Sequence, residues 1–332
     1  MKKLCLLLLL WGILGPFAAL AQQGPMFTNY HFNGLAFNPA YAGSHEHLSL
    51  NLSHRQQWVG LEGAPVTQTL TAHAPLRNER VGLGMSLTND QLGPGGSTDL
   101  AGSYAYRMQV GARKKLKLSI GLQASLANWR GNFSAITVEH ADDPSFAQNL
   151  SRWLPNFGAG AYLYGEKFYF GIGLPQLLEY DLRKTKKDTE GIFAKNYRNL
   201  YLSAGAAFPL HGDQLVFRPS LLLQSAGFLS DLKTEVPGQN IGAPLSANLG
   251  AALLFRQLFW AGVSYRTAFS GKSSQDSANL WLAWSLRNGM RFGAAYDITL
   301  SKLRTVSSNA FEIMLGYEFD VKVKQVSSPR YF

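Results

Sequence analysis

Cysteine is almost absent from this sequence: Cys5 is the one cysteine among 332 residues, and it lies in the apolar stretch that begins the chain. We expect that stretch to be removed, which leaves a mature chain without cysteine. A chain of this kind has no disulfides and no thiol nucleophile, because both require the cysteine sulfur.

Charge is also scarce. Charged residues make up 16% of the chain, whereas a soluble domain usually carries about 25%. Long apolar runs are missing too, because no stretch after the N-terminus approaches the ~20 residues of a membrane-spanning helix. Aromatic residues reach 12%, and there are 33 glycines. This combination of few charges, many aromatic residues and glycines, and no spanning helix favours a β-barrel.

Residues 1–21 have the features of a secretory signal peptide. Lys2 and Lys3 precede an apolar run, which ends in the small-residue pattern Ala19-Leu20-Ala21. A membrane anchor is the rival interpretation, but the run is short. We therefore expect cleavage before Gln22. The expected organisation is a signal peptide at 1–21, a periplasmic or lumenal segment at 22–45, a transmembrane barrel at 46–320 and a tail at 321–332.

Strict alternation of apolar and polar residues predicts strands. In "KLKLSIGLQASL", residues 115–126, Leu118, Ile120 and Leu122 share one face, while Ser119 and Gln123 lie on the other. The same period of two recurs in "AFEIMLGYEFD" (310–320), "NLWLAWSLRN" (279–288) and "MRFGAAYD" (290–297). Strands of about ten residues with this pattern are typical of membrane barrels. A soluble sandwich also alternates, so one strand decides little.

The connections between the strands distinguish a membrane barrel from a sandwich better than the strands do, because they alternate between short and long. We expect strands near 46–56, 66–76, 80–89, 99–110, 115–127, 154–164, 167–173, 199–208, 214–224, 245–255, 258–267, 278–287, 289–298 and 310–320. Short links follow every second strand, and long links begin at Gln57, Asp90, Asn128, Leu174, Ser225, Ala268 and Thr299. Short periplasmic turns and long extracellular loops are typical of outer-membrane barrels. The sequence therefore predicts an all-β, antiparallel transmembrane barrel of about 14 strands.

Four blocks of the chain are distinctive: "FTNYHFNGLAFNPAYAGS" (27–44), "RQQWVGLEGAPVTQTLTAHAPL" (55–76), "AAYDITLSKLRTVSSNAFEIMLGYEFD" (294–320) and the terminal "SPRYF" (328–332). These blocks resemble the PorP/SprF family of Bacteroidetes outer-membrane proteins. The resemblance implies an outer-membrane component or accessory of the type IX secretion and gliding machinery. Its expected partners are secreted cargo or surface adhesins, subunits of that machinery, and outer-membrane lipid.

Two groups of residues are candidates for partner binding. Asn38, Pro39, Tyr41 and Gly43 could form a docking turn, although asparagine, proline and glycine also suit a purely structural plug or lid. The second group, at the end of the first strand and the start of its loop, is Arg55, Gln57 and Trp58. Trp58 also fits an aromatic girdle at the membrane interface.

Charged residues that alternation places in the lumen are expected to form ion pairs or, alternatively, a selectivity ring. These residues are Asp297, Arg291, Glu312 and Glu318. A basic cluster surrounds one short turn and includes Arg107, Arg113, Lys114, Lys115 and Lys117. Its expected place at the periplasmic rim suits anionic lipid or an acidic partner better than nucleic acid.

Catalysis has little support in the sequence. The seven histidines form no H-E-x-x-H motif, and no cluster has the spacing of metal ligands. His45 and His47 are a weak exception, since they share one face of the expected first strand. We predict no enzyme activity, no catalytic residues, no metal and no cofactor. The expected function is support for the export or surface anchoring of large secreted proteins such as adhesins. The alternative is a passive porin or small-solute transporter.

Overall fold

The computed structural model describes residues 28–45, 47–77, 79–111, 116–132, 149–181, 195–212, 214–228, 245–269, 277–300 and 309–319. The expected signal peptide at 1–21 and the expected tail at 321–332 lie outside the described residues. So do Arg113, Lys114 and Lys115 of the basic cluster. Among the described residues, no helix has the length and apolar character needed to cross a membrane.

Fourteen antiparallel strands form the wall of a closed barrel in the described part of the chain. The first half comprises β1 (Ser49–Gln56), β2 (Val66–Pro75), β3 (Val81–Leu92), β4 (Gly95–Val110), β5 (Leu116–Gly131), β6 (Leu150–Tyr164) and β7 (Phe168–Leu174). The second half comprises β10 (Asn199–Ala206), β12 (Leu215–Ala226), β13 (Ser246–Phe255), β14 (Phe259–Ala268), β15 (Ser277–Ser285), β16 (Met290–Thr299) and β17 (Ala310–Glu318). Three two-residue strands, β8 (Tyr180–Asp181), β9 (Lys195–Asn196) and β11 (Phe208–Pro209), lie in the connections.

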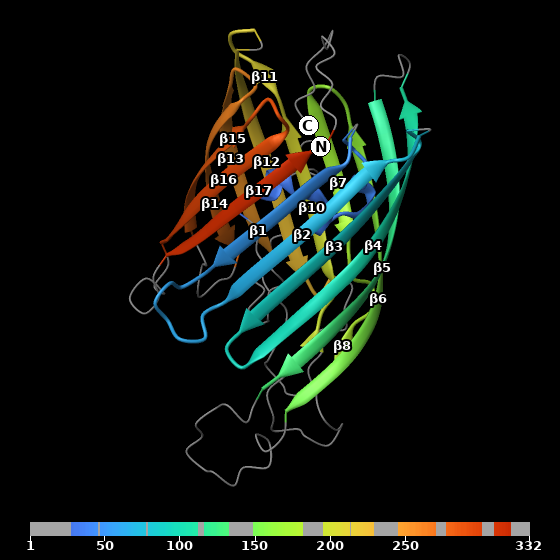
Figure 1. The fold of residues 1–332 in the computed structure, drawn as a ribbon, viewed down its shortest axis with the longest axis vertical. Coiled ribbons are helices and arrows are strands. Elements are labelled where there is room, and N and C mark those ends of the chain that lie inside the picture. Colours follow the sequence, from blue (N-terminus) through green and yellow to red (C-terminus); the bar gives the residue numbers. More distant parts are fainter. Residues whose placement is uncertain are drawn as a thin grey trace, which may run out of the picture.

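Neighbouring strands pair in sequence order, and two further pairings close the ring. β1 pairs with β17, with Ser49 opposite Glu318, and β10 pairs with β12 across the short β11. Figure 1 shows the strands side by side and inclined to the long axis of the molecule. The predicted all-β barrel is thus confirmed, and each of the fourteen expected strands overlaps an observed one.

The alternation of apolar and polar residues in the sequence corresponds to the outer and inner faces of the barrel wall. On β5, Ile120 and Leu122 are 50% and 62% exposed on the outer face, whereas Ser119 and Gln123 are buried on the inner face. β17 repeats the pattern, with Ile313 outside and Glu312 inside. An apolar exterior and a polar interior are what a barrel needs when its outer face contacts lipid.

One expected loop is a tight hairpin instead. The long link predicted from Asp90 is absent, because β3 and β4 continue to pair until Leu92 lies opposite Gly95. Only Gly93 and Pro94 connect them, and Gly93 has a φ of 55°. A two-residue hairpin with glycine first requires this positive φ. Thr98 also donates to Asn89 Oδ1 across the two strands (3.0 Å).

The lipid-facing position of Leu122 predicts a large effect of charge. Leu122→Arg should lower the stability of the barrel by about 2–4 kcal/mol, because a guanidinium near the bilayer midplane is poorly solvated. Unfolding in lipid vesicles would measure the difference. Leu122→Phe, which keeps the surface apolar, is the matched control and should behave like the wild type. Equal tolerance of arginine and phenylalanine would contradict a lipid-facing wall.

The orientation of the barrel can be tested with single cysteines, since no cysteine follows Cys5 in the sequence. Glu62 lies in the loop between β1 and β2, and Arg77 lies in the short turn between β2 and β3; both are exposed. An impermeant thiol reagent should label Glu62→Cys on intact cells and leave Arg77→Cys unlabelled. The reverse pattern would invert the topology.

Candidate functional site: a plug in the barrel lumen

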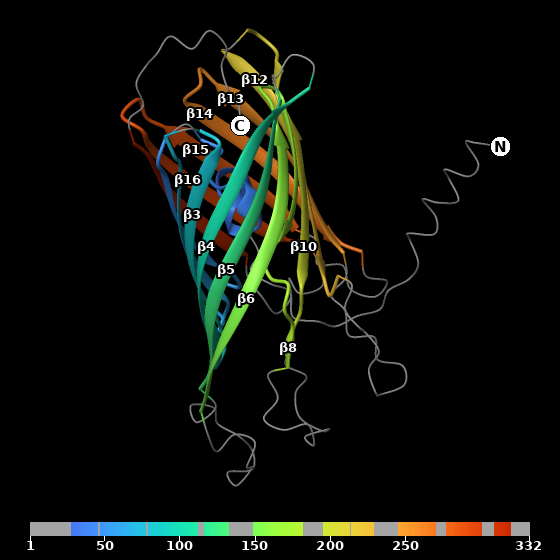
Figure 2. The same ribbon diagram turned by 90° about the vertical axis from the view of Figure 1, so that its right-hand side faces the viewer.

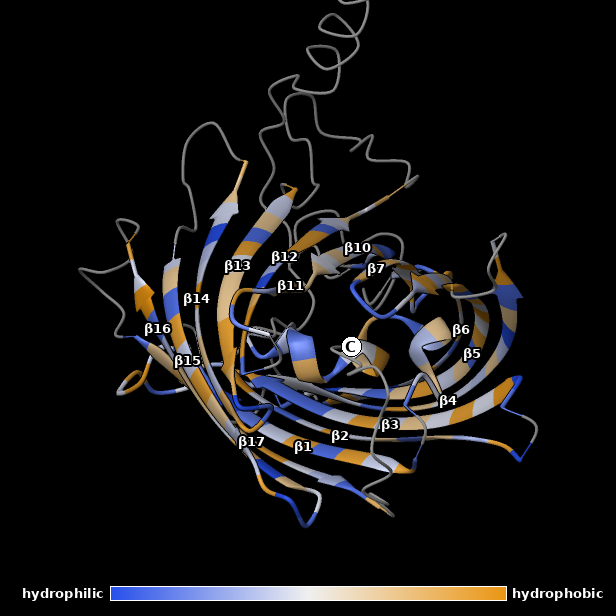
Figure 3. Cartoon of the chain, turned by 90° about the horizontal axis from the view of Figure 1, so that it is seen from above, coloured by the Kyte–Doolittle hydropathy of each residue, from blue (hydrophilic) through white to orange (hydrophobic). Residues whose placement is uncertain are grey.

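Residues 28–45 form a plug inside the barrel. The plug contains three short 3-10 helices, η1 (Tyr30–Phe32), η2 (Gly34–Ala36) and η3 (Pro39–Tyr41), and most of its residues are buried. Figure 2 shows these N-terminal turns behind the strands of the wall, and Figure 3 shows them within the ring of strands. The stretch that has neither helical nor strand periodicity in the sequence is therefore a lumenal element.

The start of η3 is fixed by Asn38 and Pro39. Asn38 Oδ1 accepts a hydrogen bond from the Ala40 backbone N–H (3.0 Å), which is the role of a helix N-cap. Pro39 follows at the first helical position, where its missing N–H costs nothing. Asn38 also donates from Nδ2 to the Ala161 carbonyl of β6 (3.0 Å). One side chain thus shapes the plug and attaches it to the wall.

Glycines of the wall let the plug backbone come unusually close. A Cβ added to Gly121 on β5 would lie 2.5 Å from Ala40 Cα, and one added to Gly82 on β3 would lie 2.7 Å from the Ala42 carbonyl carbon. One added to Gly173 on β7 would lie 3.0 Å from Asn38 Cα. Real Cβ atoms essentially never approach closer than 3.0 Å. Glycine is therefore required where this wall meets the plug.

Gly43 ends the plug in a conformation that favours glycine. Its φ is 65°, and its carbonyl accepts a hydrogen bond from the Arg107 guanidinium of β4. Its N–H donates to His73 Nδ1 on β2 (3.2 Å). Arg107, which the sequence grouped with a basic rim, is buried and points to the plug.

The first residues of the plug bind a cluster of buried charges near the loop ends of the strands. The Thr28 and Asn29 N–H groups donate to the Glu312 carboxylate at 2.8 and 3.2 Å. Arg55 pairs with Asp297 (2.5 Å) and Glu312 (3.5 Å), and Arg266 lies 3.7 Å from Asp297. Paired charges with further hydrogen bonds are the arrangement that makes burial of charge tolerable.

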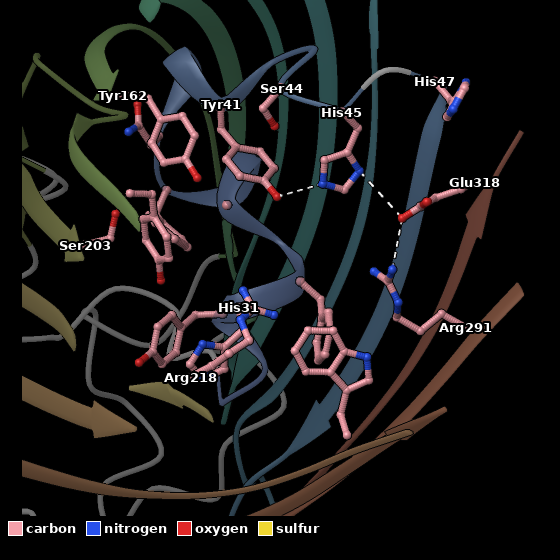
Figure 4. A pocket seen from close by; sticks show the side chains of 17 residues that line it. His31, Tyr41, Ser44, His45, His47, Tyr162, Ser203, Arg218, Arg291 and Glu318 are labelled. Atoms are coloured by element: carbon pink, nitrogen blue, oxygen red, sulfur yellow. Dashed lines mark hydrogen bonds and ion pairs between the residues drawn. The ribbon is translucent and has the colours of Figure 1, made fainter. Parts of the chain in front are cut away.

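The other end of the plug joins a second charged group near the short turns. The Tyr41 hydroxyl and His45 Nε2 share a hydrogen bond (3.1 Å), and His45 Nδ1 lies 3.7 Å from Glu318. Glu318 also accepts from Arg291 (3.0 Å). Figure 4 shows this chain of contacts from Tyr41 to Arg291. Asp297, Arg291, Glu312 and Glu318 thus form lumenal ion pairs, as expected from their alternation.

His45 was expected on the first strand and lies outside it, because β1 begins at Ser49. Its ring contacts Tyr41 and His73 instead, with centroids at 5.8 and 5.0 Å. Among the described residues, no group of three or more histidines, cysteines, aspartates or glutamates could hold a metal ion. His45 and His73 contribute ring packing and hydrogen bonds at this end of the plug.

A cavity of about 260 Å³ lies between the plug and the wall. Plug residues form one side, and residues of β6, β7, β10, β12, β14, β16 and β17 form the other. Figure 4 shows aromatic rings and two guanidiniums around it. The main lining residues are Tyr30, His31, Tyr41, His45, Tyr162, Tyr169, Arg218, Trp260, Arg291 and Glu318.

His31 is held neutral in the plug. Burial, and to a lesser extent the positive charge of Arg218, lowers the pKa of His31 to about 3. Its ring packs against Tyr30 and Trp281, with centroids at 3.9 and 5.1 Å. Burial lowers the pKa of His45 as well. Protonation of either ring therefore opposes seating of the plug.

Acid should loosen the plug. His31 has a pKa of about 3 when seated and an ordinary value near 6.5 when released. Its contribution to seating is complete above pH 6.5 and is lost progressively as the pH falls towards about 3. Ion conductance of the purified barrel should therefore rise as the pH falls from about 6.5 towards about 3. His31→Phe should weaken this response, and His54→Phe, on an outward position of β1, should not. A conductance that does not change with pH would contradict the prediction.

The structure separates the seven candidate residues into three places. Asn38, Pro39, Tyr41 and Gly43 lie together in the plug, and Arg55 is buried in the charge cluster below the first plug residues. Gln57 and Trp58 lie in the loop after β1 and are partly exposed. Trp58 has a φ of 49°, and its carbonyl accepts from Leu61 N–H (3.0 Å). The seven residues therefore do not form one surface.

The wall residues that receive the plug were missed from sequence. These residues are the strand glycines Gly82, Gly121, Gly160 and Gly173. A glycine inside a strand weakens the strand and often marks a place where another backbone approaches closely. Gly121 was placed on the inward face by alternation. That combination of glycine and an inward position is the signal that could have found them.

A closed antiparallel barrel with an apolar exterior and charged lumen defines an outer-membrane β-barrel protein. The chain belongs to the PorP/SprF family, because the family model described as type IX secretion system membrane protein PorP/SprF matches residues 19–317. The protein is accordingly an outer-membrane protein associated with type IX secretion. The family description names a secretion membrane protein and no enzyme class.

Solved structures with the same fold are distant in sequence. The CymD monoaromatic hydrocarbon channel is 15% identical, with 90% of this chain and 95% of that chain covered and a TM-score of 0.51. A Pseudomonas aeruginosa FadL homologue is 12% identical, with coverage of 89% and 95% and a TM-score of 0.46. The likeness to the CymD channel concerns the fold alone. A search of curated proteins found no match.

Proposed function

We propose that this barrel supports the export or surface anchoring of a large secreted protein, such as an adhesin, through protein–protein contacts and without catalysing a reaction. Its partners would be that cargo and subunits of the type IX machinery, in contact with outer-membrane lipid. Membership of the PorP/SprF family supports the association with secretion. Removal of residues 1–21 as a signal peptide during export is part of this proposal.

The observation that carries the proposal is the plug. A passive porin needs a water-filled path along its axis, whereas other outer-membrane barrels are filled by a folded segment. Here residues 28–45 lie within the strands, attached at one end to Glu312 and at the other to Arg107. The close approach at Gly121 and Gly82 leaves no room for water between the plug and that part of the wall. An interaction role fits such a lumen better than solute passage.

The candidate residues take two roles in this proposal. Asn38, Pro39, Tyr41, Gly43 and Arg55 act from inside, by holding the plug in its shape and place. Gln57 and Trp58 lie in a loop and are available to a partner outside the barrel. A partly exposed tryptophan offers the large rigid surface that dominates interface energies.

Deletion of the gene tests the proposal. We expect one or more surface proteins, or spreading motility, to be lost and then restored by the wild-type gene. Trp58→Ala should restore them less well, while Leu61→Ala, at an exposed position of the same loop, is the matched control. Unchanged secretion together with lost uptake of a small solute would reject the export role and support the porin alternative.

A further inference from the structure

The cavity beside the plug faces the short-turn rim of the barrel. Tyr169, Trp260 and Arg291 are each the second residue of their strands, directly after a short turn. Glu318 is the last residue of β17, at the same rim. Because short turns face the periplasm in outer-membrane barrels, this cavity is placed to receive a ligand from the periplasm.

Among the described residues that line the cavity, Arg218 and Arg291 contribute guanidiniums, and Glu318 contributes a carboxylate that binds Arg291 and His45. The Arg218 guanidinium lies 4.4 Å from the centroid of Trp260, and that of Arg291 lies 5.0 Å from the centroid of Phe32. Stacking of this kind holds a guanidinium in a fixed orientation.

The remaining surface is aromatic with hydroxyl groups. Tyr30, Tyr41, Tyr162 and Tyr169 contribute rings and phenols, and Phe32 and Phe37 add apolar surface. The rings of Tyr41 and Tyr162 pack edge to face at 5.3 Å, so this wall is ordered by its own contacts. Small-molecule sites commonly combine such apolar walls with a few convergent polar groups.

We propose that this cavity binds a monocarboxylate with an aromatic or short peptide body. The planar fork of a guanidinium matches a carboxylate, and the Arg291–Glu318 pair displays that match within the cavity. The carboxylate contacts Arg218, and the body of the ligand lies against the tyrosine rings. The proposal does not depend on the export role.

Calorimetric titration of the purified, folded barrel tests this site. The probes are N-acetylphenylalanine and its uncharged amide at neutral pH. The acid should bind about tenfold or more tightly than the amide, which corresponds to about 1.4 kcal/mol. Arg218→Gln should reduce binding of the acid to the level of the amide. Arg256→Gln, in an exposed turn at the same rim, should leave it unchanged.

The carboxylate could belong to a polypeptide C-terminus or to a free metabolite, and a tetrapeptide that ends in phenylalanine distinguishes these two sources. Binding of the tetrapeptide with a free end, but not with an amidated end, assigns the site to a polypeptide C-terminus; binding of the small acid alone assigns it to a free metabolite. Equal binding of acid and amide, no binding of either, or wild-type affinity in Arg218→Gln would overturn the proposal.

Arg218→Lys covers the case in which Arg218→Gln does not fold. Lysine keeps the charge and lacks the planar fork, so binding of the acid should fall between the wild type and the amide level. Heat-modifiable mobility on gels verifies that each variant is a folded barrel. Wild-type affinity in a folded Arg218→Lys would also argue against recognition by the guanidinium.

Discussion

Replacing Gly121 with leucine should open the barrel to ions. A Cβ at this position already falls 2.5 Å from Ala40 Cα and from the Pro39 carbonyl carbon, and a leucine extends further into the same space. The β5 strand cannot move outward easily, because it is paired with β4 and β6 along its length. The plug is attached by fewer contacts, so its displacement is the easier response.

Conductance across a planar bilayer measures this effect. The wild type should conduct weakly, and Gly121→Leu should show frequent open steps at the cost of about 1–3 kcal/mol of stability from overpacking. Gly102→Leu is the matched control, since a Cβ on Gly102 of β4 meets nothing within 4 Å. A folded Gly121→Leu that conducts no more than this control would show that the plug is not seated through the glycines.

Replacing Arg55 with methionine should destabilise the barrel by about 3–5 kcal/mol, because it leaves buried carboxylates without their partner. Arg55 contacts Asp297 and Glu312 directly, and its Nη1 also donates to the Thr28 hydroxyl (2.5 Å). Arg266 remains, but it lies 3.7 Å from Asp297 and cannot neutralise both acids. The plug end should loosen at the same time, since Glu312 and Thr28 are held by the same cluster.

Denaturant unfolding of the folded barrel measures this loss. Adding Glu312→Gln to Arg55→Met removes one unpaired charge and keeps an oxygen to accept from Thr28 N–H. The double variant should therefore recover part of the lost stability. Arg77→Met, at an exposed turn position, controls for loss of an arginine as such. Equal stability of Arg55→Met and Arg77→Met would contradict a structural role for the cluster.

The barrel could be predicted because its signal is local. Along β5, lipid-facing leucines alternate with small polar residues, and each face of the strand is set by the neighbouring residues alone. The same alternation correctly placed Glu312 and Asp297 in the lumen. The hairpin at Gly93 was missed because the residues that follow it, from Gly95 to Thr98, are small and polar like those of a loop.

The sequence left a lumenal plug as one of two possibilities, but the conformation and position of the plug could not be predicted. Its short 3-10 helices have no repeating hydrophobic period, so its buried residues do not share one face of a long element. Its position depends on contacts that are distant along the chain, such as Asn38 with Ala161 and Thr28 with Glu312. Arg55 was identified as a candidate, but its partners Asp297 and Glu312 lie more than 200 residues away, so its structural role could not be predicted.

The central claim is that this barrel works by binding proteins of the secretion route. Affinity purification of the tagged barrel from native outer membranes tests it most directly, with Trp58→Ala purified in parallel. The account predicts that a secreted protein or a type IX subunit copurifies with the wild type and is reduced with Trp58→Ala. Recovery of the barrel alone, together with steady ion conductance of the purified wild type, would contradict it.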